Sequence, residues 1–237
     1  MSRSTELHVY DRDKEYIIAV GVPSFGAVSM AWHLAMLQLQ TPLNRALRHI
    51  AVQGKEVGDA RNEIVRLALD YQGELGDRVS HVLFIDDDVL VPPDAPARLL
   101  SHKLPIVAGL YYARTVAPQP LVLKDRYQGV ADNLPSEGLY PCHGHGMGCT
   151  LIAREVFEAL EPPWFKTTRD ATSLSENAPT HWFQSEDMYF LERAREQGHQ
   201  PTVDCGLFCW HYSLAEGVGY PIQKWKERGN GSKRTIQ

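Results

Sequence analysis

The sequence predicts an α/β fold in which a mainly parallel sheet is flanked by helices within a single domain. Strand and helix patterns alternate along most of the 237 residues. The strand patterns are short apolar runs, as expected of strands buried on both faces, and parallel neighbours need crossover connections. No repeat or linker divides the chain, and its length suffices for one self-contained core.

The first strand–helix–strand unit occupies the N-terminal quarter of the chain. The predicted strand 16–20 is apolar and is closed by Gly21. A helix is predicted for 29–40, because apolar residues recur at helical spacing and Pro42 follows its end. A second strand is expected at 47–52.

The next elements continue the alternation. We expect Asp59 to cap a helix at 60–71, whose apolar residues share one face. The clearest strand is 81–85, with the sequence HVLFI. A short helix begins at Pro92-Pro93-Asp94 and reaches 102, and another strand is predicted at 106–112.

The second half of the chain is less regular. An edge strand is expected at 121–123, and helices are expected at 154–160 and 185–197. Gly198 is a residue typical of the end of a helix, and a last strand is predicted at 202–210.

Composition excludes several classes of protein. The chain has 24 Lys and Arg against 29 Asp and Glu, a net charge of −5, which argues against a surface coated in positive charge for nucleic acid. No segment approaches the roughly 18 apolar residues of a membrane span, and the first residues lack the apolar stretch of a secretion signal. We therefore expect a cytoplasmic protein with no membrane partner; its oligomeric state stays open.

The cysteines raise the question of a zinc site. Their spacings, with six and then three intervening residues, do not match the tight pairs of zinc knuckles, and buried free thiols are the favoured expectation. The cysteines and the histidines beside them are Cys142, Cys149, Cys205, Cys209, His143, His145 and His211.

An acidic triplet directly follows the clearest strand. Asp86, Asp87 and Asp88 would repel one another, and a hard divalent cation relieves such repulsion through oxygen ligands. Asp86 and Asp88 would point the same way in an extended segment, at the sheet edge where ligands bind in α/β folds. The alternative is a solvated acidic turn before a helix that Asp94 caps.

Several motifs, in order, are similar to those of glycosyltransferases with the GT-A fold. HVLFIDDDVLVPPDAPARLL, followed by IVAGLYYAR, resembles their DxD region. IIAVGVPS resembles the first nucleotide-binding strand, and DARNEIVRLAL resembles the helix after the second strand in small bacterial and phage members. GHGMGCTLIAREVFEAL resembles their glycine-rich acceptor loop, and SEDMYFLERAREQGH their ED helix. The resemblance extends over most of 16–212.

The resemblance implies a metal site and a nucleotide-sugar donor, with a UDP-sugar favoured. Asp86 would approach the ribose or the metal, and Asp88 would bind Mn²⁺ or Mg²⁺ at the donor diphosphate. His211, after CGLFCW, would be the third protein ligand. Without the resemblance, His211 reads as a satisfied histidine at a strand end.

The resemblance also implies a catalytic base. Glu186 or Asp187 would remove the proton of an acceptor hydroxyl in an inverting reaction, and the family position favours Asp187. Both residues also suit the first turn of a helix, whose dipole stabilises acidic side chains. If neither serves as the base, a retaining mechanism is the better account.

Further residues are expected to hold the donor. The first strand ends where a nucleobase would rest, guanidinium and amide groups suit a diphosphate, and a glycine lets the backbone approach a sugar. The alternatives are a solvated helix start and an ordinary turn. These expected donor-binding residues are Pro23, Ser24, Arg61, Asn62, Asp86, Asp87 and Gly146.

We expect a transferase domain at 14–214 and a basic tail at 215–237. The tail could contact DNA, fold over the diphosphate or be merely solvated. In its small size the chain resembles phage-encoded transferases, some of which decorate hydroxymethylated DNA bases, so modified DNA is a candidate acceptor, beside a surface polysaccharide precursor or a protein hydroxyl. The tail's basic residues are Lys224, Lys226, Arg228, Lys233 and Arg234, against Glu227.

The sequence therefore predicts a metal-dependent glycosyltransferase that acts on a hydroxyl acceptor. Two other classes stay open: a nuclease or nucleotidyltransferase that uses two metals, and a nucleotide-sugar binder without catalysis.

Overall fold

The structure is a computed structural model of the whole chain, and it describes residues 17–73, 76–124, 130–131, 133–170, 182–222 and 224–226. Most of the predicted basic tail, including Arg228, Lys233 and Arg234, lies outside the described residues.

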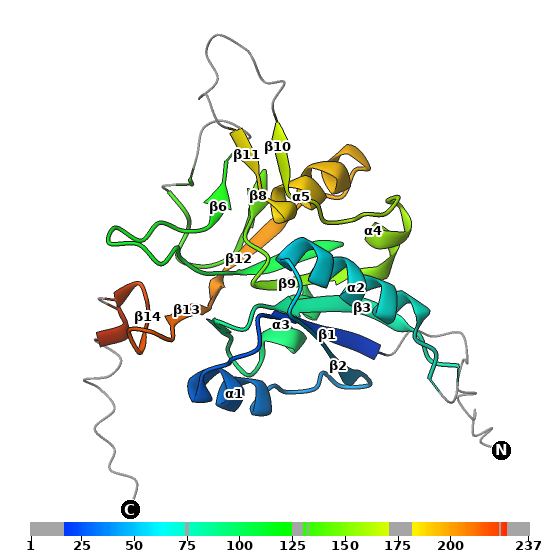
Figure 1. The fold of residues 1–237 in the computed structure, drawn as a ribbon, viewed down its shortest axis with the longest axis horizontal. Coiled ribbons are helices and arrows are strands. Elements are labelled where there is room, and N and C mark those ends of the chain that lie inside the picture. The colour runs from blue at the N-terminus through cyan, green and yellow to red at the C-terminus, as the bar shows by residue number, and fades with distance from the viewer. Residues whose placement is uncertain are drawn as a thin grey trace, which may run out of the picture.

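A seven-stranded sheet forms the centre of the molecule (Figure 1). Five of its strands run in one direction, while β9 and β7 run against their neighbours. The predicted α/β fold with a mainly parallel sheet is confirmed. In spatial order the strands are β2 (Ala46–Gln53), β1 (Ile17–Ser24), β3 (Val79–Ile85), β9 (Cys149–Ala153), β5 (Ile106–Leu110), β12 (Thr202–Phe208) and β7 (Leu139–Pro141).

Helices cover both faces of this sheet, because alternate side chains of each central strand point to opposite faces. In β3, Val82 and Phe84 pack into one apolar cluster, and Leu83 and Ile85 pack into the other. One face is covered by α2 (Val57–Asp70), α4 (Arg154–Glu158) and α5 (Glu186–Glu196), and the other by α1 (Met30–Leu37) and α3 (Ala95–Ser101) (Figure 1).

The capping residue of α2 differs from the predicted one, whereas α1 begins close to the predicted position. Ser29 Oγ caps α1 by accepting a hydrogen bond from the Trp32 amide at 2.9 Å. The expected cap of α2, Asp59, lies inside the helix instead. Its cap is Glu56, whose carboxylate accepts a hydrogen bond from the Gly58 amide in the first turn at 2.8 Å, so α2 begins earlier than expected.

Strand β9 was not predicted, and it changes the sheet order. It pairs antiparallel with both β3 and β5, so these two strands are not neighbours. The strand expected at 202–210 is also two strands, β12 and β13 (Trp210–Ser213), which belong to different sheets.

Small sheets complete the fold. β13 lies between β4 (Val89–Leu90) and β14 (Val218–Tyr220), which joins the start of the predicted tail to the domain. The other two pairs are β6 (Val122–Leu123) with β8 (Gly144–His145), and β10 (Thr168–Asp170) with β11 (Trp182–Gln184).

The four cysteines are buried and free, as expected. No helix within the described residues combines the length and apolar character that crossing a membrane requires.

Candidate active site

Several of the predicted site residues lie at the edge of the sheet where β1 and β3 end. Asp86 follows β3, and its amide donates to the Gly148 carbonyl at 3.1 Å in the loop that enters β9. The N-terminal ends of α2 and α5 come to the same edge, through an ion-pair bridge between Arg61, Asp86 and Glu186. Ligands of open α/β sheets bind at this edge.

Arg61 lies buried between two carboxylates. Its Nη2 is 2.7 Å from Asp86 Oδ1, and its Nη1 pairs with Glu186 Oε1. Burial by itself lowers the pKa of Arg61, but the two carboxylates outweigh it and raise the pKa. We expected Arg61 to grip the donor diphosphate. With an exposure of 2%, it instead holds the two acidic side chains in place.

Asp88 and His211 lie side by side because β4 and β13 pair. His211 is opposite Val89 in the register, and Asp88 Oδ2 is 3.4 Å from His211 Nε2. The same oxygen is 2.8 Å from Arg114 Nη1. Burial raises the pKa of Asp88, but the hydrogen bond and charge of His211 together with Arg114 outweigh it, so the pKa lies below the usual value.

The Asp88–His211 pair has the chemistry of a divalent cation site. His211 Nδ1 is 3.0 Å from the Tyr112 carbonyl oxygen, which can only accept, so Nδ1 donates to it and this contact orients the ring with Nε2 toward Asp88. A carboxylate and an imidazole suit Mn²⁺ or Mg²⁺. Within the described residues, however, no three His, Cys, Asp or Glu side chains come together as a metal-binding group.

Asp86, which was expected to approach the ribose or the metal, is turned toward Arg61 through Oδ1. Burial raises the pKa of Asp86, although Arg61 acts in the opposite direction. The backbone around it is fixed, since Trp32 Nε1 donates to the Asp86 carbonyl at 2.8 Å.

Asp87 points to the loop after β1. Its Oδ2 accepts a hydrogen bond from the Phe25 amide at 3.3 Å. This contact fixes the chain directly after Pro23 and Ser24, the expected nucleobase position. Asp87 thus positions the loop.

Glu186 and Asp187, the two candidate bases, have different surroundings. Glu186 is buried and paired with Arg61, and burial is the main cause that raises its pKa. Asp187 Oδ1 accepts hydrogen bonds from the Met188 amide at 2.8 Å and from the Ser185 hydroxyl. Neither bond uses Asp187 Oδ2, so Asp187 is the better placed of the two to accept a proton.

The glycines of the loop before β9 are needed because neighbouring atoms leave no room for a side chain. A Cβ at Gly148 would lie 2.9 Å from Tyr111 Oη and 3.1 Å from Asp86 Oδ2. A Cβ at Gly146 would collide with the same Tyr111 hydroxyl. Gly146, an expected donor-binding residue, therefore packs against Tyr111, whose hydroxyl accepts from the Gly148 amide at 2.9 Å.

Asn62 also has a structural setting. Its side chain donates to the Phe165 carbonyl at 2.7 Å and accepts from the Phe165 amide at 3.0 Å.

Tyr111 and Arg114 were missed as site residues. Their signal was their place in and after the predicted strand 106–112, at the same edge of the sheet.

Comparisons with known proteins identify the fold. No model of a known family matches the sequence, and no curated protein matches it significantly. Among solved structures, A197 from STIV is similar with a TM-score of 0.56 at 18% identity, over 84% of this chain and 86% of that one. S. aureus TarS 1-349, solved with UDP-GlcNAc, is similar with a TM-score of 0.45 at 11% identity, over 79% and 55% of the two chains. The likeness to A197 establishes a shared fold.

Proposed function

We propose that this protein is a glycosyltransferase of the GT-A type that transfers a sugar from a nucleoside diphosphate, with a UDP-sugar as the expected donor, to a hydroxyl group. The observation that supports it most is the contact between Asp88 and His211. The sequence motifs assigned both residues to a donor-side metal site, although they are far apart in the chain, and they lie 3.4 Å apart at the ligand-binding edge.

Asp88 and His211 would hold Mn²⁺ or Mg²⁺, and the donor diphosphate and water would complete its ligands. A bound divalent cation neutralises the charge that develops on the departing diphosphate. Arg61 keeps the Asp86 carboxylate at the same edge. Asp87, through the Phe25 amide, fixes the loop on which the nucleobase is expected to rest.

Asp187 is the proposed base. It accepts the proton of the acceptor hydroxyl as the oxygen attacks the anomeric carbon, the bond from the sugar to the diphosphate breaks, and the nucleoside diphosphate leaves. This path inverts the anomeric configuration. Glu186 is held by Arg61 and positions the start of α5 beside the base.

The first test measures release of free nucleoside diphosphate from a panel of nucleotide sugars with Mn²⁺. We expect Asp88→Asn to lower the rate about 100-fold or more, because a charged ligand of the cation is lost. Asp187→Asn is expected to lose a similar factor while it still binds donor in calorimetry. Asp70→Asn, at the exposed end of α2, is the matched control and is expected to keep full activity.

Several outcomes would contradict the proposal. Wild-type release that Asp88→Asn leaves unchanged would rule out the site. Donor binding without any turnover would identify a nucleotide-sugar binder, and metal-dependent cleavage of DNA would identify a nuclease. Labelled-sugar incorporation into hydroxymethylated DNA, with plain DNA as the control, tests modified DNA as one candidate acceptor.

A further inference from the structure

The surface around α1 is unusually apolar for an exposed helix. The described part of the chain has ten exposed large apolar residues, and six of them lie between 25 and 43. Within α1 itself, Met30, Leu34 and Leu37 have exposures of 71%, 49% and 69%. A helix that is apolar on nearly every side is usually buried by a partner or a membrane. The six residues are Phe25, Val28, Met30, Leu34, Leu37 and Leu43.

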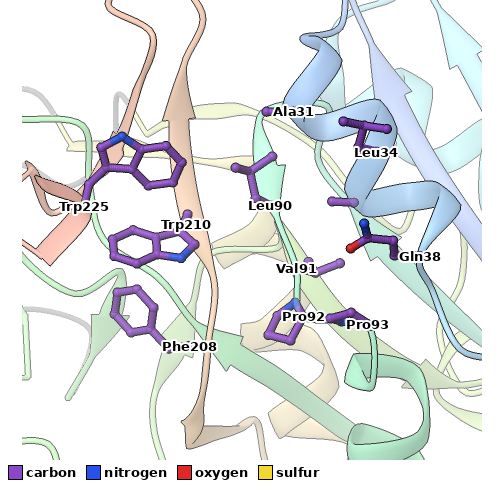
Figure 2. Close-up of a pocket in the computed structure, with 11 residues that line it drawn as sticks. Ala31, Leu34, Gln38, Leu90, Val91, Pro92, Pro93, Phe208, Trp210 and Trp225 are labelled. Carbon is purple, nitrogen blue, oxygen red and sulfur yellow. The ribbon is translucent and has the colours of Figure 1, made fainter. Parts of the chain in front are cut away.

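This surface continues into a groove, which we call the α1–Trp225 groove. It has a volume of about 440 Å³, with Leu34 of α1 and Gln38 at the end of this helix on one wall and Trp210 and Trp225 on the other (Figure 2). Leu90 lies between the two walls (Figure 2). The groove is mainly aromatic and aliphatic, and it lies on the other face of β13 from the His211 side chain, since successive side chains alternate.

The charge of this face differs from that of the whole chain. The chain has a net charge of −5, yet no Asp or Glu occurs between 17 and 55, and a carboxylate that reaches this surface from elsewhere is that of Asp87, which accepts from the Phe25 amide at 3.3 Å. On the other wall of the groove, Trp225 is flanked by the exposed Lys224 and Lys226. The face therefore combines protruding apolar side chains with an amphipathic Trp between two cations.

We propose that this face docks on the surface of an anionic phospholipid bilayer, with α1 and Trp225 in the interface. Protruding Leu, Met, Phe and Trp side chains bury in the headgroup region, and flanking lysines attract anionic lipids. The apolar residues would gain nothing from duplex DNA, which is contacted chiefly through charged and polar groups. The expectation of no membrane partner came from the lack of a spanning segment, and a helix that lies on the surface needs no such length.

The experiment is co-sedimentation of the full chain with vesicles of phosphatidylcholine, alone or mixed with phosphatidylglycerol. The wild type is expected to bind the mixed vesicles more tightly, and less so at high salt. Leu34→Glu with Leu37→Glu should weaken binding by about tenfold or more, because apolar burial is replaced by charge repulsion. Lys224→Gln with Lys226→Gln should weaken binding to the mixed vesicles alone, also by about tenfold.

Val116→Glu with Leu139→Glu is the matched control, because both residues are exposed apolar side chains outside this face, and it is expected to bind like the wild type. Wild-type protein that stays in the supernatant would overturn the proposal, as would an α1 variant that binds normally. Loss of a dimer, or of DNA binding, as the main effect of the α1 variant would also overturn it. The readout is independent of glycosyl transfer, so failure here leaves the proposed function standing.

Discussion

Arg61 is the residue on which the arrangement of the site depends most. Its guanidinium joins Asp86 at the end of β3 to Glu186 at the start of α5, and its side chain is 3% exposed. Without this cation the buried Glu186 and the partly buried Asp86 would repel each other and lose their charge-assisted hydrogen bonds. The sequence indicated Arg61 as a guanidinium for the donor diphosphate or as part of a solvated helix start, and it did not indicate the burial of this side chain.

Replacing Arg61 with methionine should therefore destabilise the fold much more than the loss of its packing contacts alone would. We expect the free energy of unfolding to fall by about 3–5 kcal/mol, because one partner of a buried ion pair is removed. Urea unfolding monitored by circular dichroism measures this change. Arg66→Met, one turn further along α2, is the control: its pair with Asp70 is exposed, so a change below about 0.5 kcal/mol is expected. Equal losses of unfolding free energy at the two positions would show that the buried ion-pair bridge stabilises the fold no more than an exposed ion pair does.

At the scale of elements, α3 is joined to the sheet by a buried carboxylate in β12. Asp204 is 1% exposed and accepts from Arg98 Nε at 2.6 Å and from His102 Nε2 at 2.8 Å. Burial raises the pKa of Asp204, but the hydrogen bonds from Arg98 and His102 outweigh it, so its pKa lies below the usual value.

Asp204→Asn should loosen this junction in a pH-dependent way. A lowered folded-state pKa means that the ionised carboxylate stabilises the fold above its unfolded-state pKa of about 3.9, and that this stability is lost as pH falls through the folded value. We expect the variant to lose about 1–3 kcal/mol at neutral pH, and this difference should begin to shrink below about pH 4 and vanish only below the lowered folded-state pKa of Asp204. Thermal unfolding across this pH range tests it. Asp94→Asn, at an exposed cap without a side-chain hydrogen bond, should track the wild type at every pH.

At the scale of the whole molecule, the residues after 214 are part of the site's support. β14 pairs with β13 so that Tyr220 lies opposite His211. Trp225 packs edge-on against Trp210 with ring centroids 5.2 Å apart. The predicted division between 14–214 and 215–237 thus falls between two paired strands.

Truncation after Leu214 should consequently destabilise the domain itself. It removes the strand partner of His211 and exposes Trp210, so we expect a melting temperature lower by several degrees and weaker Mn²⁺ binding in calorimetry. Trp225→Ala in the full chain should lower the melting temperature by less, because β14 is kept. A truncated protein as stable as the wild type, with unchanged Mn²⁺ affinity, would contradict this account.

The sequence by itself determined the alternation of strands and helices, the sheet edge at which Asp86–Asp88 lie, and the two acidic residues that begin α5. These follow from local periodicity and from the position of polar residues at element ends, which the chain carries in short segments. Only the tertiary structure decided that β9 separates β3 from β5, that Arg61 and Asn62 face inward, and that Arg114 contacts Asp88. Such features depend on strand pairing and burial between distant segments, for which a single sequence has no periodic signal.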